Sequence, residues 1–293
     1  MLILVGVLLL LLALEFPVAF AMTGASAVYI LAKGGIPLVV MAQRVTVGVD
    51  SFVLLAIPFF FLAGELMNRG GITQRLIDLA RALVGGIRGG LGHVAVVTNM
   101  IMAGMSGSAV ADATGTGTLL IPAMERAGYP KTFSAALVGA ASTIGPVIPP
   151  SIPFVIYGGI TGVSVGRLFL GGVVPGVLMG VFLMGAVYWV AKRRGYRAEG
   201  WPRLSDALTS IWRAIPVMLF PVIILGGIFS GVVTPTEAAV VAVVYAVLLA
   251  TLFYRELTPR ELVQVLTSVA GNTAKITFII ASAGLYGWLL ARE

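Results

Sequence analysis

Two interruptions of long apolar stretches place backbone carbonyl and hydroxyl groups where they could bind an ion. The first is Ser106-Gly107-Ser108, inside the apolar stretch 91–129, and the second is Gly145-Pro146-Val147-Ile148-Pro149-Pro150-Ser151. A membrane interior has no water to satisfy backbone groups, so broken helices persist there only where they are buried in protein or line a cavity. If these stretches lie in a membrane, the two breaks predict a binding site.

The residues at the breaks supply hard oxygen ligands. Gly145 frees the backbone, and four prolines lack N–H donors and leave carbonyl oxygens unpaired: Pro146, Pro149, Pro150 and Pro153. Together with serine hydroxyls, such oxygens suit a cation such as Na⁺. A new half-helix starts near Ser106, and its positive N-terminal end could face an anionic substrate. Asp112, in the first turn of this half-helix, either caps it or complements its dipole, or else serves a substrate or a proton.

The composition indicates that these stretches do lie in a membrane. Hydrophobic residues make up 59% of the chain and charged residues 11%, whereas soluble domains carry about 25% charged residues. The formal net charge is +7, but the basic residues lie in loops beside apolar spans, which favours the positive-inside rule over nucleic-acid binding. The chain has no cysteine, which excludes disulfides and thiolate metal sites. The sequence therefore predicts an all-α polytopic membrane protein.

The first apolar stretch, residues 2–31, is too long for one simple span. As a single helix it would measure about 45 Å, against a hydrocarbon core of about 30 Å. Glu15-Phe16-Pro17 lies in its middle and predicts two short helices joined by a turn, with one tilted helix as the alternative. Further spans are expected near residues 52–67, 168–190, 215–229, 238–253 and 276–290.

Short amphipathic helices are predicted between the spans. Residues 72–84 place Ile72, Leu76, Leu79 and Leu83 on one face, which predicts a helix lying in the membrane interface. Similar short pieces are expected at 204–212 and 261–266. Thr234-Pro235-Thr236-Glu237 and Thr258-Pro259-Arg260-Glu261 each predict a helix start with a capping box, which gives Glu237 a structural role.

Basic residues on both sides of 91–129 predict a re-entrant hairpin. Arg88 precedes the stretch, and Arg126 and Lys131 lie around its end, so the chain enters and returns on the same side. Besides the central break, Gly115-Thr116-Gly117 predicts a second one. With the basic segments 69–88, 126–131, 192–203 and 255–260 in the cytoplasm, two helices in the first stretch put Met1 outside, whereas a single helix would put it inside.

A weak internal repeat accompanies this topology. Pro235 follows Pro17 by 218 residues, and Gly284 follows Gly64 by 220, each pair in similar surroundings. The predicted topology gives the two copies opposite orientations, as in the inverted repeats of secondary transporters. A second copy of the Ser106-Gly107-Ser108 break would fall near residue 327, so we expect a fragment, an engineered truncation, or a gene product without its C-terminal third.

Five segments, in order along most of the chain, resemble the large membrane subunit, DctM type, of tripartite ATP-independent periplasmic (TRAP) transporters. They are Phe16-Pro17-Val18-Ala19-Phe20-Ala21, Ile57-Pro58-Phe59-Phe60 with Ala63-Gly64, Ser106-Gly107-Ser108-Ala109-Val110-Ala111-Asp112, Ser142-Thr143-Ile144-Gly145-Pro146-Val147-Ile148-Pro149-Pro150-Ser151, and Thr234-Pro235-Thr236-Glu237-Ala238. The resemblance implies an inverted-repeat, elevator-type secondary transporter. Its second repeat is incomplete in this chain, so the chain alone is not expected to transport.

The resemblance also implies a sodium site at the hairpin tip and the proline-rich segment after it, here called the clip (residues 143–151). The implied ligands are Ser106, Ser108, Gly145, Ile148 and Pro150. Candidate substrate-binding residues are Ser108, Asp112, Ser142 and Thr143. Sodium is the expected coupling ion and no other cofactor is expected, although the residues alone leave Na⁺ and H⁺ open.

The same resemblance implies the organisation and partners of the protein. Residues 1–85 would form scaffold helices and the arm helix of repeat one, 86–200 half of the transport domain, and 201–293 the start of repeat two. The implied partners are a small four-helix membrane subunit, a periplasmic binding protein and an organic acid such as a C4-dicarboxylate or sialic acid. The implied location is the bacterial inner membrane.

Other classes of protein fit the sequence less well. The alternative function is a related ion-coupled carboxylate or anion carrier that works without a binding protein. A channel is disfavoured because no filter-like segment or ring-forming charge interrupts the spans. An enzyme is disfavoured because the sequence holds no HExxH motif, nucleophile elbow, carboxylate cluster or Walker A loop.

Overall fold

A computed structural model describes residues 1–198 and 200–292, and all regular structure in this part of the chain is helical. Five of its helical stretches are long and apolar enough to cross a membrane. They are Phe52–Arg69, Val165–Arg194, Leu204–Phe229, Pro235–Phe253 and Pro259–Arg292. The predicted all-α, polytopic class is therefore confirmed.

The chain divides by packing into two units. Met1–Leu55 and Ser268–Glu293 form the first, and Ala56–Thr267 form the second. This division follows packing rather than the proposed repeat, so the assignment of 1–85, 86–200 and 201–293 to scaffold and transport halves stays a prediction.

The first unit begins with two helices, α1 (Leu2–Ala13) and α2 (Val18–Lys33). The predicted turn at Glu15-Phe16-Pro17 is confirmed, and the single tilted helix is wrong: Glu15 has φ 62° and Pro17 precedes the first residue of α2. Helix α2 packs on the end of α13 (Pro259–Arg292), where the Thr23 hydroxyl donates to Ser282 Oγ at 2.9 Å.

Helix α3 (Val39–Val47) also belongs to the first unit, and the sequence did not predict it. None of its residues is buried. At its C-terminal end it crosses α13 closely, because a methyl group added at Gly284 would lie 3.1 Å from the Gly48 Cα. Two glycines thus allow the backbones to meet, as small residues commonly do between membrane helices.

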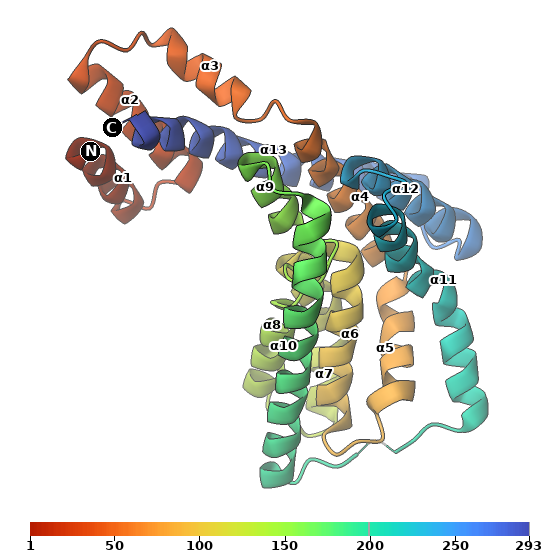
Figure 1. Ribbon diagram of the computed structural model, residues 1–293. Coiled ribbons are helices and arrows are strands. Elements are labelled where there is room, and N and C mark those ends of the chain that lie inside the picture. Colours follow the sequence, from red (N-terminus) through yellow and green to blue (C-terminus); the bar gives the residue numbers. More distant parts are fainter. Residues whose placement is uncertain (199, 293) are drawn as a thin grey trace. The chain divides into compact units, whose positions relative to one another are not determined.

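The second unit is built around a helical hairpin of α6 (Gly90–Ser106) and α7 (Ala109–Arg126) (Figure 1). The break at 106–108 is confirmed, and Gly107 turns the chain with φ 58°. The second predicted break is wrong, because α7 runs unbroken through Gly115-Thr116-Gly117. The Thr116 hydroxyl donates to the Asp112 carbonyl at 2.7 Å, one turn earlier in the same helix.

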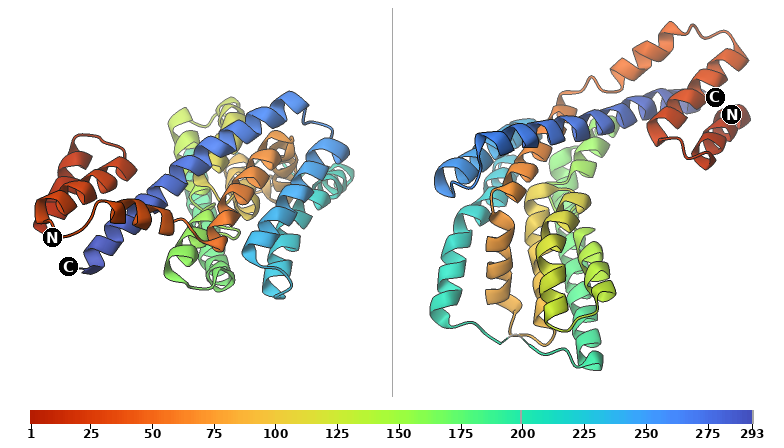
Figure 2. Two further views of the ribbon diagram at one scale, coloured as in Figure 1. Left: turned by 90° about the horizontal axis from the view of Figure 1, so that it is seen from above. Right: turned by 180° about the vertical axis from the view of Figure 1, so that it is seen from behind.

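After the hairpin come α8 (Lys131–Ser142), the clip, α9 (Ile152–Thr161) and α10 (Val165–Arg194). The predicted interruption at residues 145–151 is confirmed, because the clip separates α8 from α9. Helices α6, α7, α8 and α10 lie side by side in the second unit, as two opposite views show (Figures 1 and 2).

Helix α5 (Ile72–Val84) has the predicted bounds but not the predicted surroundings. Its apolar residues Ile72, Leu76 and Ile77 are almost fully buried. The helix runs along α6 and also packs on α11 (Leu204–Phe229) (Figure 1). Protein therefore covers most of its apolar face, except at Leu83, which is 49% exposed. The amphipathic pattern indicates that a face is buried but does not identify its partner.

The other predicted amphipathic pieces are parts of longer helices. Residues 204–212 are the first turns of α11, and 261–266 lie near the start of α13. Both predicted helix starts are confirmed. At α12 (Pro235–Leu248), the Thr234 N–H donates to the Glu237 carboxylate at 2.7 Å and the Glu237 N–H donates back to the Thr234 hydroxyl at 3.3 Å. Thr258 and Glu261 exchange the same bonds at α13.

Candidate functional site

The hairpin tip holds a compact set of hydrogen bonds around Ser106. Its hydroxyl donates to Asp112 Oδ1 and accepts from the Ser108 N–H at 3.2 Å. The Ser108 hydroxyl accepts from the Ala111 N–H at 3.4 Å and caps α7. Because Ser108 is the cap, Asp112 does not cap the helix, although it stays in the first turn of α7.

The clip is a tight chain of turns whose outer carbonyl groups stay unpaired. The Gly145 N–H donates to the Ser142 carbonyl at 3.0 Å, and the Ile148 N–H donates to the Ile144 carbonyl at 3.0 Å. Within residues 1–198 and 200–292, no hydrogen bond reaches the carbonyl oxygens of three clip residues: Gly145, Ile148 and Pro150. The prolines that follow in the clip contribute to this, because they have no N–H to donate.

The hairpin tip and the clip meet directly. A methyl group added at Gly107 would lie 2.6 Å from the Pro150 carbonyl oxygen. One added at Gly145 would lie 2.5 Å from Asp112 Oδ2 and 3.3 Å from the Ser108 carbonyl carbon. The two breaks therefore contact each other through their backbones, at Gly107 in the tip and at Gly145 in the clip.

Asp112 is the charged group of this region. It is 0% exposed, and among the described residues its Oδ2 atom has no hydrogen-bond partner. No ion pair is found for it in that part of the chain either. A buried, ionised carboxylate without a countercharge costs several kcal/mol, so this group requires either a proton or a cation. Its free oxygen lies against Gly145, one of the implied sodium ligands.

Helix α10 supports the clip with a face of glycines. A methyl group at Gly172 would collide with the Val147 carbonyl oxygen, and one at Gly176 would collide with the Ile148 side chain. One turn further, Gly180 lies against Met100 of α6. The Ile148 side chain therefore points to α10, and the missing side chains of α10 leave the space that the clip fills.

Ser142 is the last residue of α8, and Thr143 is the first residue of the clip. The Ser142 hydroxyl donates to the Gly139 carbonyl at 2.8 Å, and the Thr143 hydroxyl donates to the Ala140 carbonyl at 2.7 Å. Ser142 is buried and Thr143 is exposed. Ser142 therefore holds the clip through its carbonyl group, while its hydroxyl is used within α8.

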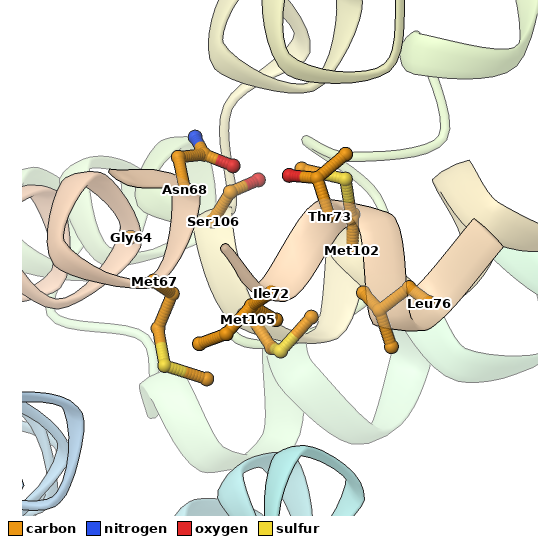
Figure 3. A pocket seen from close by; sticks show the side chains of 9 residues that line it. All are labelled: Gly64, Met67, Asn68, Ile72, Thr73, Leu76, Met102, Met105 and Ser106. Atoms are coloured by element: carbon orange, nitrogen blue, oxygen red, sulfur yellow. The ribbon is translucent and has the colours of Figure 1, made fainter. Parts of the chain in front are cut away.

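A small cavity beside Ser106 adds two residues that the sequence did not predict. It measures about 10 Å³, close to the lower limit for one water molecule, and lies between α6, α5 and α4 (Ala56–Arg69). Figure 3 shows Asn68, Thr73 and Ser106 converging at one end, with apolar and methionine side chains around the rest. Gly70 and Gly71 separate α4 from α5. That third break between apolar patterns was the signal that could have found these residues.

Comparison with known proteins places the chain among membrane transporters. The family described as "Tripartite ATP-independent periplasmic transporter, DctM component" matches residues 5–293. The 2,3-diketo-L-gulonate TRAP transporter large permease protein of Escherichia coli is 43% identical over 278 residues, which cover 95% of this chain and 65% of that protein.

Two other relatives transport different acids by name. The sialic acid TRAP transporter large permease protein of Vibrio cholerae is 41% identical over 277 residues, 94% of this chain and 65% of that protein. The C4-dicarboxylate TRAP transporter large permease protein of Pseudomonas aeruginosa is 46% identical over 244 residues, 83% of this chain and 57% of that protein. The chain thus spans less than two thirds of the length of these relatives.

Proposed function

The chain belongs to the DctM-component family of TRAP transporters, and on that premise we propose that it takes part in sodium-driven import of an organic acid. It is a multi-pass protein of the bacterial inner membrane. The three relatives described above are transporter permease proteins, which supports transport rather than catalysis.

One observation carries the proposal of a sodium site: the tip and the clip meet beside a buried carboxylate that lacks a countercharge. The proposed ligands are the hydroxyl groups of Ser106 and Ser108 and the unpaired carbonyl groups of three clip residues: Gly145, Ile148 and Pro150. A cation bound there would supply partners for the free oxygens. It would also offset the charge of Asp112, whose Oδ2 lies against Gly145.

The substrate is proposed to be an organic acid that binds near the start of α7. The positive end of that helix favours an anion, and the candidate contacts are Ser108, Asp112, Ser142 and Thr143. An ionised Asp112 would repel a carboxylate. Sodium bound beside Asp112 would remove that repulsion, which links binding of the acid to binding of the cation.

The proposed partners are a small four-helix membrane subunit and a periplasmic binding protein that delivers the acid. The proposed mechanism is an elevator movement of the hairpin and clip. Large apolar side chains on α10 and α11, such as Phe182 (73% exposed) and Val222 (62% exposed), are open to lipid or to that subunit. The family match favours this architecture over a carrier that works without a binding protein.

Binding of radioactive sodium to the purified protein tests the site. We expect K⁺ not to displace bound Na⁺, and Asp112→Asn, which keeps the shape and removes the charge, to weaken binding strongly. A protein that binds no sodium, or an Asp112→Asn variant that binds it as well as the unchanged protein, would refute the site. Uptake of candidate acids into vesicles, with the partner subunits present, then tests sodium coupling and identifies the substrate.

Cysteine labelling tests the proposed topology. Because the chain has no cysteine, a single introduced cysteine gives an unambiguous signal. Arg194→Cys is expected to react only from the cytoplasm, and a cysteine beside Met1 only from the periplasm. Periplasmic labelling at position 194 would overturn the topology.

A further inference from the structure

A groove in the first unit is lined by residues that take no part in the proposed sodium site. It has a volume of about 520 Å³ and is lined by the segment before α3, by α3 itself and by the end of α13. Its lining includes apolar Ile36, Val40 and Val47 together with Arg44, Trp288 and Arg292. The groove therefore combines an apolar surface with two positive charges.

The two arginines share one aromatic ring. The Arg44 guanidinium lies 4.6 Å from the centre of the Trp288 ring, and the Arg292 guanidinium lies 5.4 Å from it. Among the described residues, no carboxylate lines the groove, and neither arginine forms an ion pair. Two like charges held on one ring repel each other, and an anion between them would relieve that repulsion.

Helix α3 is uncovered on its apolar side as well. Val39 is 61% exposed and Val47 is 63% exposed, and no residue of this helix is buried. In a membrane protein, an exposed helix with apolar residues, arginine and a neighbouring tryptophan is typical of the boundary between acyl chains and headgroups. The ligand of the groove must therefore offer an apolar part beside its negative charge.

We propose that this groove binds an anionic phospholipid, with its phosphate between Arg44 and Arg292 and its acyl chain along Val40 and Val47. Basic pockets between membrane helices bind such headgroups in this way. A free phosphate would leave the apolar lining without a partner. A zwitterionic lipid has no net charge, so it would leave both arginine charges uncompensated, whereas an anionic phospholipid offsets at least one of them.

Native mass spectrometry of the purified protein, with phosphatidylglycerol and phosphatidylcholine added in equal amounts, tests the proposal. We expect one phosphatidylglycerol to be retained preferentially. Arg44→Gln and Arg292→Gln should each weaken its retention about five-fold, and the double variant more. Arg193→Gln is the matched control, because Arg193 also stacks on a tryptophan, Trp189 at 4.1 Å, but does not line the groove.

Several outcomes would overturn the proposal. Equal retention of both lipids, or undiminished retention by the double variant, would remove the site. Displacement of the lipid by glycerol phosphate would assign the groove to a free anion, and loss of the lipid on adding the small membrane subunit would assign it to a protein. If the double glutamine variant does not fold, the double lysine variant keeps the charge and should retain phosphatidylglycerol.

Discussion

The tip and clip of the second unit and the groove of the first unit both hold charged groups, but they hold them differently. Asp112 is fully buried and is surrounded by backbone at close approach. Arg44 and Arg292 stack on an indole beside an open groove. A buried group that loses its partner cannot turn to solvent, whereas a group beside an open groove can. The same kind of substitution should therefore lower the free energy of unfolding much more at the tip and clip than at the groove.

The largest loss of stability is expected from Gly107→Ala. Gly107 has φ 58°, and an added methyl group would lie 2.6 Å from the Pro150 carbonyl oxygen. Left-handed backbone alone costs about 1–2 kcal/mol with a side chain, so we expect the free energy of unfolding to fall by more than about 2 kcal/mol. Denaturant titration measures it. Gly139→Ala, where nothing lies within 4 Å, is the control and should be neutral or slightly stabilising.

Gly145→Val should abolish the response to sodium. The added branched side chain would meet Asp112 Oδ2 and the Ser108 backbone, so the tip and the clip would separate. Sodium-dependent thermal stabilisation is the measurement. Gly171→Val, on α10 with nothing within 4 Å of the added atom, is the matched control and should keep the response. An unchanged response in Gly145→Val would show that the tip–clip contact does not form the site.

Ser106→Ala and Ser108→Ala should weaken sodium binding without preventing folding. Each removes one proposed ligand, at a cost of about 1–3 kcal/mol for a buried unpaired partner. That corresponds to roughly a factor of 5–150 in apparent affinity. Titration of Na⁺ in the binding assay measures it. Thr118→Val is the control, since the Thr118 hydroxyl bonds to the Gly115 carbonyl and takes no part in the site.

Thr234→Ala should affect stability alone. It removes the side-chain half of the capping box at α12, which is worth about 1 kcal/mol. Denaturant titration should detect this loss while sodium affinity stays unchanged. A change in sodium affinity would mean that the start of α12 is coupled to the hairpin. The comparison of the tip and clip with the groove would then have to include α12.

The smallest effect is expected from Arg44→Gln. An exposed cation–π contact is worth about 0.5–1 kcal/mol, and the groove stays open to solvent or lipid. Sodium binding should not change. If this variant destabilises the protein more than Gly107→Ala does, the expectation that substitutions are more destabilising at the tip and clip than at the groove is wrong.

Local chemistry that acts within a few residues could be predicted from the sequence. Pro17 gave the turn between α1 and α2, and Thr234 gave the start of α12. The break at 106–108 was predictable because a single glycine there lies between two hydroxyl residues. Gly115 and Gly117 have the same freedom, yet α7 continues through them. Glycine permits a break, but only packing decides whether one forms.

Features that depend on distant partners could not be predicted. The sequence pattern of α5 predicted an apolar face. The helices that cover this face are α6 and α11, and the pattern of α5 itself does not identify them. Asp112 was found as a candidate, whereas only the structure shows that its Oδ2 atom lies against Gly145 without a hydrogen-bond partner among the described residues. Asn68 and Thr73 flank the Gly70-Gly71 break, but nothing in the sequence places that break beside Ser106.

The glycine face of α10 has a consequence for mutation. Every missense change of one base in a glycine codon introduces a side chain with a Cβ atom. At Gly172, Gly176 and Gly180 that atom would collide with the clip or with α6, whereas the exposed Val173, Val174 and Val177 between them face no such limit. Random substitutions along α10 should therefore be selected against at these three positions, which are four residues apart, and tolerated at the positions between them. A helix that supplies no proposed ligand thus restricts how the binding region can evolve.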